Sequence, residues 1–245
     1  MTNPPNTNNK QRQIMPVVIG LVTGIICFIL LQAGSCSSMI CFLSNAKTPK
    51  LPVVRQNRTL EPFSKIQVSA AVHVTLKPGP AGTAVVETHE DIQDDLTTNV
   101  ENGTLVIGLR GSHSNVKKMA VELPVDRLEK ISVSSAARVD GETMIEGDDL
   151  EIDVSSAGSI HLAVDVKRLT CRASSAARMT LSGSAVNGNF HAGSAAHINA
   201  AQLNLDSSTI DASSAAHVEI GETRQLSMQK SSAASIRYQG TPQLH

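Results

Sequence analysis

The sequence predicts an all-β protein whose main part is a β-solenoid, a β-helix with about 20 residues per coil. Three observations predict this fold. A Ser-Ser-Ala-Ala phrase returns at a nearly fixed spacing, apolar and polar residues alternate on both sides of it, and aromatic residues make up only 2% of the chain. A fixed repeat of this length is typical of structural units that stack on one another, one unit per repeat.

The phrase occurs four times in full and twice in a near form, with successive copies 18 to 21 residues apart. The copies begin at Ser134, Ser155, Ser174, Gly193, Ser213 and Ser231. Small side chains suit a bend at which successive coils approach closely, and Ser hydroxyls can bond backbone groups that a bend leaves unpaired. Because this bend is expected to be crowded, Leu in place of Ala176 or Ala195 is expected to prevent folding by overpacking.

Residues around the phrase fall into columns when the copies are aligned. Apolar residues fill the columns that begin with Ile131, Val133 and Val139, except for Lys230, which suggests that the stack ends there, and polar residues fill those that begin with Ser132 and Asp140. Such strict alternation indicates strands with one face inside and one outside. A coil of this length has room for two or three short strands, and neighbouring coils are expected about 4.8 Å apart.

The composition and net charge indicate how the interior is filled and which class of partner the chain gives no reason to expect. The chain of 245 residues has no Trp, one Tyr and a net charge of -1. With so few rings, the core must consist of small and β-branched side chains packed closely. A near-zero charge gives no reason to expect nucleic acid as a partner. Cys171 is the only cysteine among the repeats and is interpreted as a small core residue.

Residues 1–43 are predicted to be a polar, cytoplasmic tail followed by an export or membrane segment. Residues 14–31 are apolar and uncharged, close to the shortest length that spans a membrane. Three interpretations stay open: an uncleaved anchor, a signal peptide cleaved at Ala33-Gly34-Ser35, and a lipoprotein signal with Cys36 as the lipidated residue. The domain that follows is expected to be exported, in the periplasm or at the cell surface, and anchored by membrane or lipid.

Two further segments precede the regular coils. Residues 44–62 contain three prolines and no sustained periodicity, which predicts an extended linker. Residues 63–125 predict β-structure with irregular loops, in which Asn102-Gly103 between two alternating runs is a strong hairpin signal. Within this part Ser69-Ala70-Ala71 is interpreted as a degenerate first copy of the phrase, and a strand is expected to end at Pro124.

Regular coils are predicted for residues 126–240, followed by a tail at residues 241–245. Residues 60–240 resemble the family of putative auto-transporter adhesin head domains, also called GIN domains. The resemblance is carried, in order, by Ile66-Gln67-Val68, Asn102–Ile107, Leu123-Pro124, Leu128 and the serine- and alanine-rich copies.

The resemblance implies a right-handed β-helix over residues 63–240 and says little about activity. Proteins of this family are exported, often lipid-anchored bacterial proteins whose molecular function is generally unassigned. In this chain Ala-Ala stands in the second half of the phrase, where such proteins commonly have glycine, and glycine is kept only at Gly158.

One polar column contains the residues with the clearest binding potential. Arg138, Arg178, His197 and His217 form a mildly basic stripe that fits an anionic surface polymer, although a solvated face is the simpler interpretation. His197 and His217 are expected about 5 Å apart in adjacent coils, and together with His191 and Asp211 they suggest a transition-metal site. A metal site needs three convergent ligands, so no metal is predicted.

A second polar column raises the question of catalysis. Asp153, Arg172, His191 and Asp211 follow one another on consecutive coils, which suggests either a calcium-dependent polysaccharide lyase or charge pairing between strands. Charge pairing is favoured because no second carboxylate faces Asp153. The serines recur in every coil and no Gly-x-Ser-x-Gly motif is present, so no catalytic residue and no cofactor are predicted.

The sequence therefore predicts an exported, envelope-anchored, non-enzymatic β-helix that acts as a surface binding or adhesion-type module. Its expected partners are an envelope polymer or another surface protein, and the membrane through the N-terminal segment. Two alternatives stay open: a self-associating scaffold of the envelope, because solenoid ends are open sheet edges, and a polysaccharide-processing β-helix enzyme.

Overall fold

A computed structural model describes residues 49–245, which contain β-strands and one short 3₁₀ helix, η1 (Glu90–Ile92). All fifteen strands belong to one hydrogen-bonded sheet. The predicted tail and anchor at 1–43, the lipidation candidate Cys36 and the start of the predicted linker lie outside the described residues. Within 49–245 there is no helix with the length and apolar character of a membrane span.

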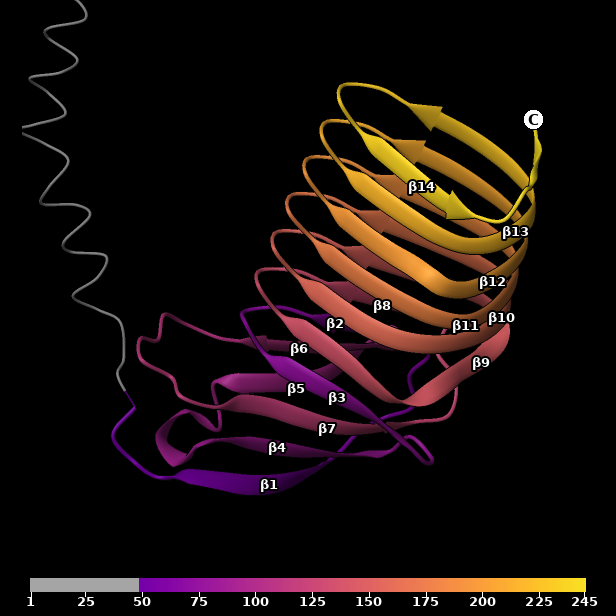
Figure 1. Cartoon of the computed structure of the whole chain (residues 1–245). Coiled ribbons are helices and arrows are strands. Elements are labelled where there is room, and N and C mark those ends of the chain that lie inside the picture. Colours follow the sequence, from indigo (N-terminus) through magenta and orange to yellow (C-terminus); the bar gives the residue numbers. More distant parts are fainter. Residues whose placement is uncertain (1–48) are drawn as a thin grey trace, which may run out of the picture. The chain divides into compact units, whose positions relative to one another are not determined.

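The regular part is a β-solenoid in which each strand stacks in parallel on the strand before it, as predicted. Each coil leaves a sharp corner, runs along the front in Figure 1, bends on the rounded side and returns behind while rising, which makes the coil right-handed. The coils are β9 (Arg138–Val154), β10 (Ser159–Ala173), β11 (Arg178–Ala192), β12 (His197–Ala212) and β13 (His217–Lys230).

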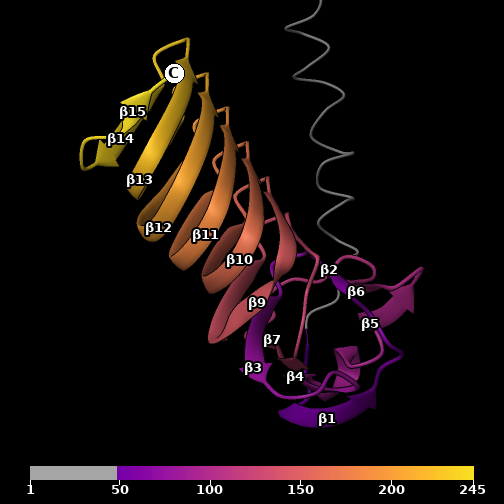
Figure 2. The same cartoon turned by 90° about the vertical axis from the view of Figure 1, so that its right-hand side faces the viewer.

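The sequence suggested two or three short strands per coil, but each coil is one long strand. Figure 2 shows these continuous ribbons side by side, viewed towards the rounded side. Pairing continues around the bend with only local irregularities, such as the register shift between His161 and Ala163. The strands therefore bend at small irregularities rather than at loops, and in β11 the irregularity lies beside Gly183, whose φ is 106°.

The Ser-Ser-Ala-Ala phrase forms the sharp corner. In the first full copy the Ala137 N–H donates to the Ser134 carbonyl over 3.0 Å, and the two residues between them have φ of 52° and 59°. Two positive φ values inside such a bond are the mark of a type I′ turn, here made without glycine. The Ala136 N–H donates to the Ser156 carbonyl of the next copy over 3.0 Å, and this bond recurs from coil to coil.

The corner differs from the prediction in two respects. Ala176 and Ala195, which were expected to be crowded, are exposed, whereas Ala177 and Ala196 are buried at 0% and 1% exposure. The proposed overpacking by Leu at Ala176 or Ala195 is therefore wrong, because only the fourth residue of the phrase points inwards. The N–H groups of the corner also donate to backbone carbonyls of the same corner and of the next one. Ser hydroxyls were expected from the sequence to bond these backbone groups.

Aliphatic side chains, with leucine beside the expected small and β-branched residues, fill the interior, and one ring is accommodated by a glycine. Phe190 is fully buried in the same column as Ile152, Cys171 and Ile210. A Cβ atom on Gly188 would lie 2.7 Å from the Phe190 ring, so this glycine makes the space for the ring. Cys171 is a core residue as predicted, and burial raises the pKa of its thiol.

The part of the chain before the regular coils, residues 49–125, is here called the front part. A first coil lies in it, at the degenerate phrase. It consists of β2 (Lys65–Val68), the corner Ser69-Ala70-Ala71 and β3 (His73–Pro78). Ala70 and Ala71 both have φ of 58°, and the Ala71 N–H donates to the Ser135 carbonyl over 2.9 Å. Since β2 pairs with β8 (Lys130–Val133) and β3 pairs with β9, this coil stacks directly below the regular ones.

Another layer lies below this first coil, although it comes later in the sequence. Its strands are β6 (Thr104–Leu109), parallel to β2, and β7 (Met119–Val125), parallel to β3. The hairpin of β5 (Leu96–Glu101) and β6 turns at Asn102 and Gly103, whose φ values of 50° and 72° confirm the predicted turn. Strand β4 (Thr83–His89) pairs antiparallel with β7, so antiparallel strands close this end of the solenoid (Figure 1).

Three boundary predictions are wrong. Within the expected linker, β1 (Val53–Thr59) pairs along its whole length with β4, although its sequence lacks the apolar alternation of a strand with one buried face. Pro124 lies inside β7 rather than at its end, beyond the residues of β7 that pair with β4. A proline is tolerated there because one side of the strand has no ladder to interrupt.

The third correction concerns the expected tail at residues 241–245. Gln243–Leu244 form β15, which pairs with β13 beside β14 (Ser235–Gln239). In this last layer the inner positions are less covered than in the coils below, and in β13, directly beneath it, Met228 is already 40% exposed. The column that begins with Val139 thus continues into β14 as Ile236 with less burial, whereas the column that begins with Val133 ends in the exposed Lys230.

Candidate surface-binding site

Two rows of polar side chains flank the corners on the outside of the solenoid. The first row, here called the basic stripe, occupies the first position after each corner. Its residues are in register on successive strands: His73, Arg138, Ser159, Arg178, His197, His217 and Ser235. The four predicted binding residues therefore do lie in one column. The second row, here called the charge ladder, occupies the second position before the corner and contains Asp153, Arg172, His191 and Asp211.

Sequence reasoning missed His73 as a member of the basic stripe. It belongs to β3 in the front part, outside the regular spacing of the copies. The available signal was the degenerate phrase, since His73 follows Ser69–Val72 as Arg138 follows Ser134–Ala137. Aligning the degenerate copy with the others would have placed it in the stripe.

The beginning of the stripe is neutralised by Asp140. Arg138 donates to both carboxylate oxygens of Asp140, over 2.6 Å from Nε and 3.0 Å from Nη2. His73 Nε2 lies 2.7 Å from the same carboxylate. Burial alone would raise the pKa of Asp140, but the bonds and charges of Arg138 and His73 outweigh it and hold the pKa below its ordinary value. Arg138 is therefore not a free cation for a ligand.

The later part of the stripe is different, because Arg178, His197 and His217 meet no bonded carboxylate among the described residues. These three residues on β11, β12 and β13 are here called the cationic triplet. The ring centroids of His197 and His217 lie 4.8 Å apart in an edge-to-face arrangement, which confirms their predicted spacing. Arg178 is exposed and makes no ion pair within residues 49–245.

His197 is the half-buried middle member of the triplet. Its Nδ1 atom is buried and has no hydrogen-bond partner in the described part of the chain. Burial lowers the pKa of His197, and the neighbouring His217 and Arg178 lower it further, whereas Glu219 opposes this effect. A proton on His197 is therefore disfavoured in the free protein, first by burial and then by the neighbouring His217 and Arg178.

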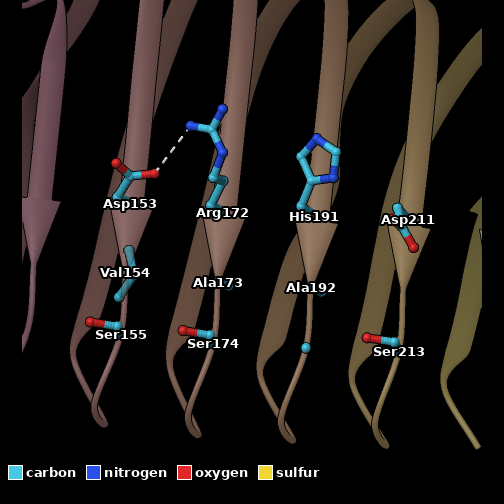
Figure 3. Close-up of a pocket in the computed structure, with 11 residues that line it drawn as sticks. Asp153, Val154, Ser155, Arg172, Ala173, Ser174, His191, Ala192, Asp211 and Ser213 are labelled. Carbon is cyan, nitrogen blue, oxygen red and sulfur yellow. Dashed lines mark hydrogen bonds and ion pairs between the residues drawn. The ribbon is translucent and has the colours of Figure 1, made fainter. Parts of the chain in front are cut away.

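The charge ladder lines an open groove of about 510 Å³ beside the corners. Figure 3 shows its four members on neighbouring strands, with Ser155, Ser174 and Ser213 in a second row below them. Asp153 accepts a salt bridge of 2.8 Å from Lys130 and one of 3.4 Å from Arg172, which also bonds Glu151. These contacts are the pairing between strands that the sequence favoured.

The two carboxylates that line the groove, Asp153 and Asp211, are not close together, and the acid beside Asp153 is Glu151, with which it shares Lys130 and Arg172. Asp153 and Asp211 are three coils apart, which corresponds to roughly 14 Å along the stack. Glycosidases hold their two carboxyl groups within about 10 Å of each other. Between them stand Arg172, already bonded to acids, and His191.

The four residues of the metal hypothesis lie on different faces. His191 and Asp211 precede their corners, while His197 and His217 follow them. The structure therefore separates the two pairs. In residues 49–245 no group of three or more His, Cys, Asp or Glu side chains has a metal-ligating arrangement.

The front part holds a polar side chain that the sequence did not single out. Arg58 of β1 donates to the Gln93 carbonyl over 2.5 Å, to Thr98 Oγ1 over 3.2 Å and to the Leu96 carbonyl. It lines a polar pocket of about 280 Å³, and burial lowers the pKa of its guanidinium although Asp94 opposes this. Because its donors are used by backbone acceptors, Arg58 ties β1 to β5 and η1 rather than presenting a free cation.

Comparisons with known proteins extend the description of the fold. The family described as "Putative auto-transporter adhesin, head GIN domain" matches residues 62–242. No curated protein matches the chain. Among solved structures, a putative adhesin from Bacteroides fragilis is similar with a TM-score of 0.67 and 15% identity, covering 80% of this chain and 98% of that one.

Two further structures have the same fold. A putative adhesin from Parabacteroides merdae has a TM-score of 0.59 and 12% identity, covering 81% of this chain and 98% of its own. A protein from Parabacteroides distasonis called a "putative lipid binding protein" has a TM-score of 0.59 and 13% identity, covering 82% and 100%. At these identities the likeness concerns the fold alone.

Proposed function

The chain belongs to the family described as "Putative auto-transporter adhesin, head GIN domain", and from this membership we propose that it is an exported, non-enzymatic binding module of the cell surface. The description of the family as adhesins, and the same word for two of its structural neighbours, support an adhesion-type role outside the cytoplasm. The partner we propose is a polymer of a cell envelope, bound along the outside of the coils.

The observation that carries this proposal is the cationic triplet, with Arg178, His197 and His217 in register on three consecutive strands. Successive strands are about 4.8 Å apart, so the stripe presents donors at a regular spacing along the solenoid axis. An extended polymer lying along this axis contacts several donors at once. Weak contacts then add up to useful affinity because the later contacts form within one complex.

The contacts of the charge ladder support a structural rather than a catalytic role for this row of residues. Its only arginine is bonded to Glu151 and Asp153, and its two aspartates are far apart along the stack. The alternative of a polysaccharide-processing enzyme predicts that the full chain releases unsaturated uronate from a uronate polymer. If the full chain releases unsaturated uronate and the variant Asp211→Asn does not, the enzyme replaces the binding module as the proposed function.

The test is retention of the full chain, kept in nonionic detergent, on isolated bacterial envelope polymer. The double variant Arg178→Ala/His197→Ala is expected to lose about tenfold in retention, because two of the three adjacent donors are removed. The matched control is Arg172→Ala/His191→Ala, which removes one arginine and one histidine from the charge ladder. Equal retention of the two variants would overturn the assignment to the stripe, and unchanged unfolding temperatures would show that both are folded.

A second candidate function is self-association, which is favoured by the apolar side chains exposed on the last layers. Met228, Tyr238 and Leu244 are 40%, 38% and 58% exposed. Sedimentation of the full chain over a range of concentrations is the test. A mass that rises with concentration, and that returns to the monomer value in Tyr238→Lys, would favour the scaffold over the binding module.

A further inference from the structure

The donors of the cationic triplet fit an anion that reaches across strands. Arg178 pairs in register with His197, and His197 pairs in register with His217. All three side chains leave the sheet on the same side, because residues in register on parallel strands point to the same face. A guanidinium offers two parallel N–H donors to one phosphate or carboxylate, and each protonated imidazole offers N–H donors to the next.

Charges around the triplet determine what it attracts. From β11 the triplet itself supplies Arg178, and β13 contributes Glu219 on the same outer face. From β14, Arg237 is in register with Glu219. On β12 the corresponding position is the uncharged Asn199. Two arginines and one glutamate give this patch a net charge of +1 with neutral histidines, and protonation of both histidines raises it to +3.

Proton binding by the two rings is coupled to anything that adds negative charge. With rings 4.8 Å apart and Arg178 beside them, protonating both in the free protein brings three positive charges together. An anion lying over the rings removes most of that repulsion. Because linkage is reciprocal, an anion that favours the protonated rings must itself bind more tightly when the rings are protonated.

The stripe also shows what prevents such coupling. At its beginning Asp140 already occupies Arg138 and His73, with contacts of 2.6 Å and 2.7 Å. An external anion would have to displace this carboxylate. The triplet carries no such internal anion among the described residues, so it is the part of the stripe left to an external one.

We propose that Arg178, His197 and His217 form a proton-linked site for the phosphate or carboxylate groups of a linear anionic polymer. The inference rests on the proposed function, because it names the partner class and the regulation of the same face. Affinity increases as the pH falls through the range in which His197, whose pKa is lowered in the free protein, gains a proton. A surface module with this property holds its polymer in acidic surroundings and releases it in neutral ones.

The experiment measures binding of the full chain in nonionic detergent to linear polyphosphate and, separately, to polygalacturonate, by calorimetry at about pH 5.5 and 7.5. The affinity for at least one polymer is expected to rise about tenfold at the lower pH. The binding enthalpy is expected to vary with the ionisation enthalpy of the buffer, which reports proton uptake. The two polymers distinguish phosphate from carboxylate as the preferred group.

Variants separate the proton-linked site from general charge attraction. His197→Gln/His217→Gln should keep part of the binding at pH 7.5 and lose the increase at pH 5.5. Arg178→Gln should weaken binding at both pH values and keep a pH response, although the size of that response changes because Arg178 itself lowers the pKa of His197. The matched control His161→Gln removes an exposed histidine from the neighbouring column of β10 and should retain the full pH response.

The outcomes distinguish this inference from the proposed function. If the full chain is retained on envelope polymer but its affinity for both polymers is equal at the two pH values, the proton-linked site is overturned and the binding module stands. A pH response that persists in His197→Gln/His217→Gln also overturns it. If no polymer binds at either pH, both proposals fall, and binding only to vesicles of anionic lipid would replace the polymer with a membrane surface.

Discussion

The regular coils and the front part are built from the same kind of corner but order their strands differently. In the coils each strand stacks on the one before it in the sequence, as β10 does on β9. In the front part β2 lies between β6 and β8, so Lys65 pairs with Thr104 on one side and Lys130 on the other. A repeated register can therefore be read from a sequence, whereas a stack with rearranged strands cannot.

Stabilisation also differs between the two regions. The coils are stabilised by columns of equivalent side chains, so a substitution in one coil alters the packing of the coils directly above and below it. The front part relies on individual contacts, such as those of Arg58 between β1 and β5, and on antiparallel strands that cover the end of the stack. Substitutions in the two regions should accordingly differ in size and in reach.

The largest effect is expected for Phe190→Ala in the middle of the coils. Loss of this fully buried ring should destabilise the protein by about 3–5 kcal/mol. The ring leaves a cavity inside β11, and the paired strands β10 and β12 prevent β11 from moving inwards to fill it. Urea unfolding of the full chain in detergent measures the effect. Gly188→Leu in the Phe190→Ala background should recover part of the loss, since Leu150 and Leu169 stand at the same position in the two coils before. Failure of this rescue would contradict the register of the columns.

The corner should show a smaller effect that depends on which alanine is changed. Ala177→Leu is expected to cost about 1–3 kcal/mol by overpacking the interior behind the corner. Ala176→Leu, one residue earlier and exposed, should stay within about 0.5 kcal/mol. Thermal unfolding of the two variants checks the difference. The same loss in both would mean that the inward residue of the phrase has been assigned wrongly.

The regular coils were predicted more accurately from the sequence than the front part. The fold class, the apolar columns, the corners and the Asn102-Gly103 turn were predictable because alternation and spacing are local signals. Strand β1 was missed because an edge strand with both faces largely exposed has no apolar alternation, and its evidence is the backbone pairing with β4. The stacking of β6 and β7 below β2 and β3 depends on contacts between distant residues.

The candidate site was predictable in its position and not in its charge state. Columns placed Arg178, His197 and His217 together because the copies repeat. That Arg138 is neutralised by Asp140 depends on a rotamer and on His73 from another part of the chain. The spacing in the sequence shows which residues share a face. Whether a charged residue on that face is already paired with another side chain is seen only from the contacts in the structure.

A local effect is expected in the front part from Arg58→Ala. The Gln93 and Leu96 carbonyls lose a charged donor, at a cost of about 1–3 kcal/mol if they are not resolvated. Amide hydrogen exchange should increase in β1, η1 and β5 and stay unchanged in β10–β12. The control Arg224→Ala, which removes an exposed pair with Asp206, should cost at most about 1 kcal/mol. Increased exchange throughout the coils would show that the two regions are not energetically distinct.

The smallest effect is expected at the junction of the two regions, where Asp140 of β9 bonds His73 of β3. Because the folded state lowers the pKa of Asp140, its stabilisation is present above the ordinary pKa of about 4 and is lost as the pH falls below it. Asp140→Asn should thus be less stable than the natural chain near neutral pH, by at most about 1 kcal/mol because the site is partly exposed. Urea unfolding at several pH values should show the difference vanish in acid, and Arg138→Ala should reduce it at neutral pH.

The same variant tests the contrast within the basic stripe. Asp140→Asn releases Arg138 and His73 from their internal anion, so these side chains become available to an external one. Affinity for the anionic polymer should therefore rise while stability falls, opposite to the change expected from simple loosening of the fold. Unchanged or lower affinity in this variant would show that Arg138 and His73 do not contact the polymer even when they are released from Asp140.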